Sequence, residues 1–342
     1  MNSLQETELG QDLHQLVSDQ PFAPDIEMIG QRARQRRRRG LALRGATAAG
    51  AAILAAGGLV TAFHGTGSTT PGVAAGRPPA ASRGPAANPR LVTLAAYVQA
   101  SSGSLPGDAS LVATTKTIGG RQVETDYFLY SDSGDIYSAA SETGLPAAVA
   151  HRASIADGTE AREVAAARYA ATGDLATARE RMVNITGRNL GLGLSPAERQ
   201  KIWARSIAAS RKIFREKGVK PPAGPPAGKA LAELAGNRIW ISSMDALTAG
   251  GGNPQVRAGV LRLLATVPEV TVANSTTGGR PALTLTAGPS LFEGGSPEVL
   301  RIDARTGSPI TFSSAADGNV PSSVQTYRVS RVTLAGIEAG KF

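Results

Sequence analysis

The stretch QRARQRRRRGLALRGATAAGAAILAAGGLVTAF, residues 31–63, decides how the whole chain is laid out. A run of arginines leads into residues 41–63, which are apolar and almost uncharged. As an α-helix, residues 41–63 would be about 34 Å long, enough to cross a hydrocarbon core of about 30 Å. The stretch therefore predicts a transmembrane helix over residues 41–63.

The arginines beside this segment set its orientation, because basic clusters stay on the cytoplasmic side of a membrane helix. The topology-determining residues are Arg32, Arg34, Arg36, Arg37, Arg38, Arg39 and Arg44. No other stretch approaches the roughly 18 apolar residues that a membrane span needs. We therefore expect a single-pass protein of the plasma membrane, with a cytoplasmic N-terminus and its C-terminal domain outside.

Two other interpretations of residues 41–63 stay open. Arg38-Arg39 loosely resembles a twin-arginine export signal, and Val60-Thr61-Ala62 has the small residues of a cleavage site. Cleavage there would leave a secreted domain instead of an anchored one. The segment is also weakly hydrophobic, as a buried helix of a soluble domain would be.

The segments on either side of this helix differ in composition. Residues 1–40 form the cytoplasmic tail, with six acids in residues 1–31 followed by the arginine cluster. Residues 64–90 hold five prolines among glycine, alanine and serine, which is typical of a linker. Residues 91–342 form the extracytoplasmic domain, which is long enough to bury its own core.

Composition limits the chemistry and the partners. Cysteine is absent, which excludes disulfides, thiol chemistry and cysteine-ligated metals. The net charge is +9, and residues 45–342 carry 29 bases against 21 acids, which suits anionic headgroups, acidic wall polymers or a solvated basic surface. We expect no nucleic-acid partner, because the arginine run lacks interleaved aromatics. The expected partners are the lipid bilayer and, at the tail, a cytosolic regulatory protein.

Alternating and β-branched runs predict two antiparallel meanders. Residues 110–118 and 121–131 flank Gly119-Gly120, a two-residue hairpin signal, and the turn at residues 132–134 leads to a third strand. The second meander is predicted at residues 269–273, 281–287, 298–303, 309–312 and 323–334.

Helical patterns fill most of the sequence between the meanders. The predicted helices cover residues 91–101, 159–171, 175–185, 196–217 and 254–267, with Asp174, Ser195 and Asn253 as caps. Strands, then helices, then strands indicate an α+β fold with a mostly antiparallel sheet and packed helices. A half-barrel, as in periplasmic lipoprotein carriers, is compatible with this order by fold analogy alone.

No pattern of catalytic or metal-binding residues emerges from the sequence. The histidines, His14, His64 and His151, fall in three different segments, and no G-x-S-x-G or P-loop is present. We therefore expect no enzyme, no cofactor and no metal site, although His151 is a conceivable general base in the outer domain. Asp132, Asp135 and Glu142 suit turn chemistry better than a weak cation site.

Several stretches in order resemble an actinobacterial family of single-pass membrane proteins of unknown function, often encoded beside extracytoplasmic-function sigma factors. They are residues 24–39, 127–134, 256–272, 279–283 and 300–307, with Glu269 where that family carries glycine. Residues 145–230 depart from the family pattern. The family carries no agreed catalytic residues, so the resemblance assigns none here.

These observations predict a membrane-anchored, non-enzymatic envelope protein that senses or regulates, with a sigma-factor pathway as its expected context. The alternative is an extracytoplasmic carrier or receptor for an apolar ligand, a lipid or a lipoprotein, held on the concave face of the sheet. One structural test separates the two, because the carrier needs an open groove over its apolar strand residues. Those residues are Tyr127, Leu129, Leu283, Leu285, Ile302 and Val329.

Overall fold

A computed structural model describes residues 87–101, 107–156, 158–185, 190–216, 218, 220–292, 294–316 and 321–342. The predicted cytoplasmic tail, the seven topology-determining arginines, residues 41–63 and nearly all of the linker lie outside these ranges. Within the described ranges, no helix combines the length and the apolar character that a membrane crossing requires.

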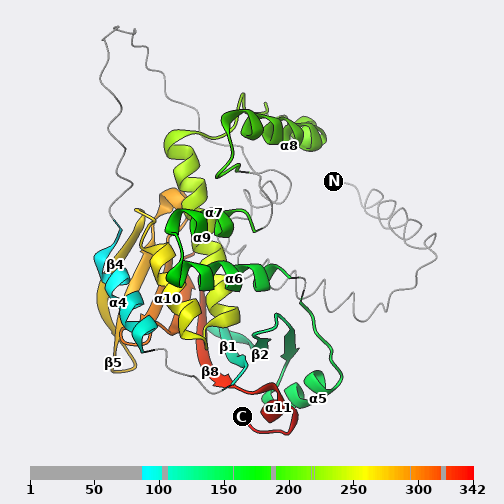
Figure 1. The fold of residues 1–342 in the computed structure, drawn as a ribbon, viewed down its shortest axis with the longest axis vertical. Coiled ribbons are helices and arrows are strands. Elements are labelled where there is room, and N and C mark those ends of the chain that lie inside the picture. Colours follow the sequence, from blue (N-terminus) through cyan, green and yellow to red (C-terminus); the bar gives the residue numbers. More distant parts are fainter. Residues whose placement is uncertain are drawn as a thin grey trace, which may run out of the picture. The chain divides into compact units, whose positions relative to one another are not determined.

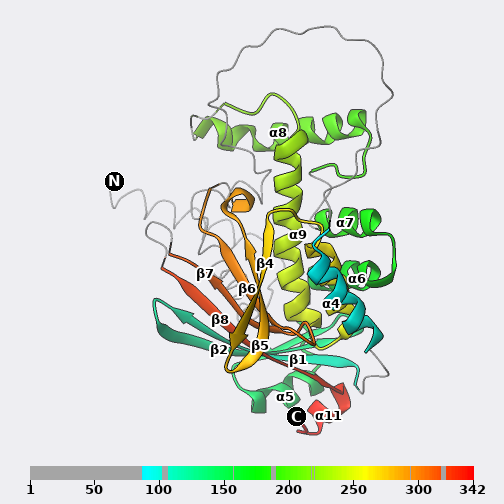
Figure 2. The ribbon, with the colours of Figure 1, turned by 90° about the vertical axis from the view of Figure 1, so that its left-hand side faces the viewer.

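The described part is α+β and is built on one antiparallel sheet of eight strands, in the order β3-β2-β1-β8-β7-β6-β5-β4 (Figures 1 and 2). The strands are β1 (Ala109–Ile118), β2 (Arg121–Ser131), β3 (Ile136–Ala139), β4 (Val270–Thr277), β5 (Arg280–Ala287), β6 (Glu298–Asp303), β7 (Pro309–Ser314) and β8 (Ser323–Val332). The predicted fold class and the mostly antiparallel sheet are confirmed.

Both meanders form where the sequence predicted them, and their tight turns depend on glycine. Gly119 and Gly120 have φ of +54° and +81° between β1 and β2, and Gly278 and Gly279 have +58° and +74° between β4 and β5. Glycine adopts these angles without a Cβ clash, so each pair closes a two-residue hairpin.

The two meanders join through their first and last strands. β1 pairs with β8 from Ala109↔Val332 to Ile118↔Ser323, so the ends of the domain sequence meet in the middle of the sheet. This pairing spans more than 200 residues of chain, which no local pattern encodes. Figure 2 shows how strongly the strand direction rotates across the sheet.

Eight α-helices and two short 3-10 helices accompany the described strands. They are α4 (Pro89–Ala100), α5 (Leu145–Ala150), α6 (Thr159–Thr172), α7 (Leu175–Val183), α8 (Pro196–Glu216), α9 (Gly228–Gly250), α10 (Pro254–Leu264), α11 (Leu334–Glu338), η1 (Glu142–Gly144) and η2 (Pro289–Phe292).

Three predicted helix caps are formed. The Asp174 side chain accepts a hydrogen bond from the Thr177 amide at 2.8 Å, and Asn253 accepts from the Gln255 amide at 2.9 Å. Ser195 and Glu198 make a reciprocal capping box at the start of α8, with the Ser195 amide 3.0 Å from Glu198 Oε2. The caps explain why these three boundaries were readable from sequence.

Helix α9 was not predicted from the sequence, and it is central to the fold. It packs against the inner face of the sheet on one side and against α6, α7 and α10 on the other (Figure 2). Ile239 and Trp240 are fully buried in its middle. A helix buried on several sides carries apolar residues all round and lacks the one-sided stripe by which helices are recognised.

Among the described residues, α5 and α11 cover the opposite face of the sheet at its β1–β2–β3 end. Leu111, Leu129 and Tyr137 pack there against Leu145 and Ile337. The last strand was predicted to run to Leu334, but α11 begins at that residue, and Thr333 caps the helix by accepting a hydrogen bond from the Gly336 amide at 2.9 Å. The last strand therefore ends at Val332.

Candidate ligand pocket

A small pocket of about 180 Å³ lies where the β2–β3 turn meets α6 and the C-terminal end of α9. The three elements are far apart in sequence, so the pocket exists only in the folded domain. Its principal lining residues are Ser110, Tyr130, Ser131, Asp132, Ser133, Gly134, Asp135, Ile136, Glu160, Ala161, Val164, Ala165, Arg168, Ala249 and Gly250.

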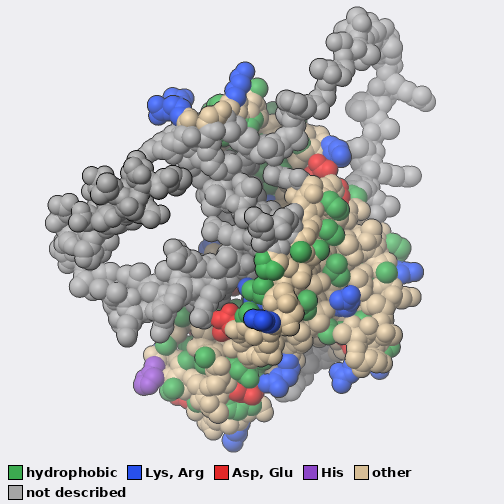
Figure 3. Space-filling view, turned by 180° about the vertical axis from the view of Figure 1, so that it is seen from behind, with side chains coloured by type: hydrophobic (Ala, Val, Ile, Leu, Met, Phe, Trp, Pro, Cys, Tyr) green, Lys and Arg blue, Asp and Glu red, His purple; other side chains and the backbone are tan. Residues whose placement is uncertain are grey.

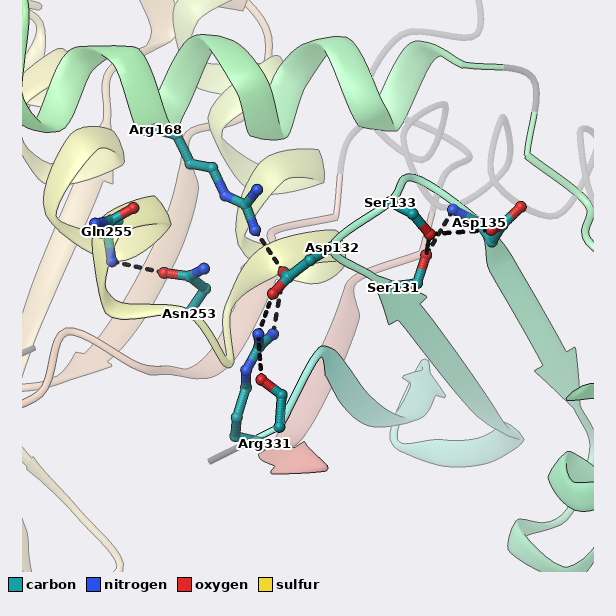
Figure 4. A network of polar contacts seen from close by, with 9 residues as sticks. Ser131, Asp132, Ser133, Asp135, Arg168, Asn253, Gln255 and Arg331 are labelled. Atoms are coloured by element: carbon teal, nitrogen blue, oxygen red, sulfur yellow. Dashed lines mark hydrogen bonds and ion pairs between the residues drawn. The ribbon is translucent and has the colours of Figure 1, made fainter. Parts of the chain in front are cut away.

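The turn between β2 and β3 supplies hydroxyl and carboxylate groups to this pocket (Figure 4). The hydroxyl oxygens of Ser131 and Ser133 lie 2.7 Å apart, and Ser133 donates to Asp135 Oδ2 at 3.1 Å. The Asp135 amide donates back to Ser131 Oγ at 2.8 Å. These local bonds hold the turn in one conformation, as the turn chemistry of serine and aspartate predicts.

Asp132 anchors the other side of the turn through two arginines (Figure 4). Its carboxylate pairs with Arg168 from α6 and with Arg331 from β8. The Arg331 guanidinium also donates to the Gly107 carbonyl at 2.9 Å. The Arg331 side chain is only 11% exposed, so its charge depends on Asp132 far more than a surface arginine would.

The pocket carries both signs of charge with a negative surplus. Asp132, Asp135 and Glu160 contribute carboxylates, whereas Arg168 and the adjoining Arg331 contribute guanidiniums that Asp132 already neutralises in part. Small apolar side chains from α6 and α9 complete the wall. Such a lining suits a small polar solute that carries an amine, because the carboxylates around the pocket outnumber the guanidiniums.

The structure brings together two of the acids that the sequence singled out and separates the third. Asp132 and Asp135 both line the pocket, but Glu142 pairs with Arg328 at 3.4 Å. In the described ranges no group of three potential metal ligands occurs. His151 is exposed at the end of α5. Arg168 and Arg331 were missed, because no spacing rule links Asp132 to a helix residue 36 positions away or to a strand residue 199 positions away.

A second polar cluster lies under α9, between that helix and the sheet. Trp240 donates its indole N–H to Glu298 Oε2 at 2.6 Å, and Glu298 is 5% exposed. Burial, reinforced by nearby Asp245 and opposed by the Trp240 hydrogen bond, raises the pKa of Glu298 to about 7. Burial also raises the pKa of Tyr327, which a hydrogen bond with Thr248 partly offsets. This cluster is enclosed by the fold and was not foreseen.

The apolar residues named as the carrier test are mostly covered. Leu129, Leu285 and Ile302 are fully buried, and Leu283 is nearly so. Leu283, Leu285 and Ile302 share one core with Trp240 and Leu247 of α9, so this helix occupies the inner face where an apolar ligand would lie. The residues that cover this face belong to α9, a helix that was not predicted from the sequence.

Comparisons of the chain with protein-family models, with curated proteins and with solved structures found no match.

Proposed function

We propose that this chain is a membrane-anchored, non-enzymatic envelope protein whose outer domain senses a small polar solute. The proposal combines the arginine-to-apolar junction at residues 31–63 with the pocket between α6 and the β2–β3 turn. The pocket is the observation that supports the ligand-binding part of the proposal. It is walled by three elements whose relative positions a bound solute would stabilise.

The negative surplus favours an amine-bearing ligand over an anion. The side chains at the pocket include three carboxylates, Asp132, Asp135 and Glu160, against the two guanidiniums of Arg168 and the adjoining Arg331. An ammonium group would gain from the carboxylates, whereas a carboxylate or phosphate would have to displace Asp132 from its arginines.

A matched set of four-carbon probes tests this preference on the full chain in detergent. Putrescine, 1,4-butanediol and succinate have similar lengths but charges of opposite sign or none. We expect putrescine to raise the unfolding temperature and succinate to leave it unchanged. Equal responses to all three probes would contradict the proposed ligand class.

Variants tie the response to the pocket. Ala165→Leu fills space in the wall and should abolish the putrescine response, while Ala208→Leu, an exposed alanine of α8, should keep it. A putrescine response that survives Ala165→Leu would show that the amine binds elsewhere. Asp135→Asn should weaken the response without abolishing folding, because the amide still accepts from Ser133.

The cytoplasmic half of the proposal concerns residues 1–40, with a sigma-factor pathway as the context that the family resemblance suggests. We propose that this tail contacts a cytosolic regulatory protein. A pull-down with residues 1–40 should recover such a protein, with the same peptide in scrambled order as its control. Recovery of nothing above the scrambled peptide would count against the regulatory role.

A further inference from the structure

Helix α8 carries basic side chains on one face and buried side chains on the other. Its sequence, PAERQKIWARSIAASRKIFRE, holds six basic and two acidic residues. Lys201, Arg205, Arg211 and Arg215 are exposed. At 100° per residue these four fall within about 120° of the helix circumference, over a length of about 21 Å.

The buried residues of α8 lie on the opposite side of the same helix. Trp203 is 6% exposed, Ser210 is 4% exposed and Phe214 is 4% exposed. Their positions on the helical wheel cluster about half a turn from the middle of the basic stripe. The basic stripe is therefore the surface that α8 presents outward.

The charge of this stripe is not cancelled within the described part of the chain. Lys201, Arg205, Arg211 and Arg215 make none of the ion pairs found there. The acidic residue nearest the start, Glu198, is engaged in the capping box with Ser195. Figure 3 shows Lys and Arg atoms at the end of the domain where α8 lies, and Figures 1 and 2 place α8 beyond the N-terminal end of α9.

We infer that the basic stripe of α8 binds the anionic headgroups of the membrane that anchors the chain. The inference rests on the proposed membrane anchoring, which keeps the outer domain close to a bilayer. A straight row of cations matches a flat anionic surface, and each basic residue near such a surface adds about 1 kcal/mol of attraction. Trp203 and Phe214 are buried on the side of α8 opposite the basic stripe, so the contact is electrostatic rather than insertional.

The absence of native cysteine makes a labelling test direct. Ala208→Cys places an environment-sensitive fluorophore on the exposed face of α8, and Ser330→Cys places the same label on exposed β8. The full chain is reconstituted into vesicles of phosphatidylcholine with or without phosphatidylglycerol, which also carry a headgroup-attached quencher.

We expect quenching at position 208 that grows with phosphatidylglycerol and falls at high salt, with little change at position 330. Replacing Lys201, Arg205, Arg211 and Arg215 by Gln should reduce the apparent affinity of α8 for phosphatidylglycerol, measured from the quenching at position 208, at least about tenfold. A matched quadruple variant with Gln at exposed Arg121, Arg280, Arg305 and Lys341 should quench like the parent.

Quenching that does not depend on phosphatidylglycerol, or an equal loss of quenching in both quadruple variants, would overturn the inference. Binding of a soluble polyglycerol phosphate with no response to phosphatidylglycerol would assign the stripe to acidic polymers and would also overturn it. Failure of the anchoring itself is distinguishable, because the chain would then be released from the vesicles by alkaline carbonate whatever their charge.

Discussion

Glu298 is a carboxyl group whose surroundings disfavour its charge. Burial under α9 and the proximity of Asp245 raise its pKa to about 7 from 4.5, and only the Trp240 indole opposes this. Because the folded state holds the proton more tightly than the unfolded state, Glu298 favours folding below about pH 4.5. That contribution is lost as pH rises through about 7.

The substitution Glu298→Gln should remove this pH dependence, since glutamine keeps the volume and an acceptor for the indole N–H. Each pKa unit corresponds to about 1.4 kcal/mol, so the wild type should lose up to ~3 kcal/mol relative to the variant between pH 4.5 and pH 8. Urea unfolding of both proteins across this range measures the difference. A difference that stays constant with pH would show that Glu298 is ionised normally.

Gly259 permits the closest approach between α6 and α10. A Cβ at this position would lie 1.7 Å from the Ala167 carbonyl oxygen, which is backbone and cannot rotate away. We predict that Gly259→Ala destabilises the domain by about 3 kcal/mol or more through forced separation of the helices. Gly224→Ala is the matched control, because nothing lies within 4 Å of its Cβ and it should be nearly neutral. Comparable unfolding temperatures for the two variants would contradict the packing account.

At the scale of elements, Asp132 ties the β2–β3 turn to α6 and β8. Asp132→Ala leaves Arg331 poorly exposed and without its carboxylate, so we expect a loss of about 1–3 kcal/mol. Arg331→Ala alone should cost a similar amount. The double variant should lose clearly less free energy of unfolding than the two single variants added together, because either substitution alone already breaks the Asp132–Arg331 pair. Additive losses in chemical unfolding would mean that the pair is not coupled.

The elements that could be predicted are those whose boundaries carry local chemistry. Gly119-Gly120 marked a hairpin, and Asp174, Ser195 and Asn253 marked helix starts. Helix α9 escaped notice because it is surrounded by the sheet and by other helices, so burial erased its periodic signal. The α+β class was correct without α9, although the packing of the inner face was not foreseen.

At the scale of the whole molecule, long-range pairing determines what local patterns do not. The β1–β8 ladder makes one sheet of two meanders and brings Arg331 to Asp132. The sequence identified Asp132 and Asp135 as turn residues, yet the pocket around them needs α6 and α9 in place. The acidic residues Asp132 and Asp135 could therefore be picked out from the sequence as turn residues. The basic residues Arg168 and Arg331 could be assigned to the site only from the fold.

The arginine cluster should control the orientation of the entire chain. Replacing Arg36, Arg37, Arg38 and Arg39 by Gln should yield a mixed topology, because Arg32, Arg34 and Arg44 retain part of the bias. A reporter that is active only after export, fused after Phe342, measures the fraction in each orientation. Gln at Arg121, Arg280, Arg305 and Lys341 controls for lost charge alone. Undiminished reporter activity in the arginine variant would show that the arginine cluster does not set the orientation of the chain.

Protease protection in intact spheroplasts tests the proposed membrane anchoring most directly. The account predicts that added protease digests the outer domain and leaves a protected fragment that contains residues 1–63. A mature chain beginning near Phe63 would instead show a cleaved signal and a secreted domain. Protection of the C-terminal domain, residues 91–342, would contradict the proposed topology and with it the placement of the pocket and of α8 outside the cell.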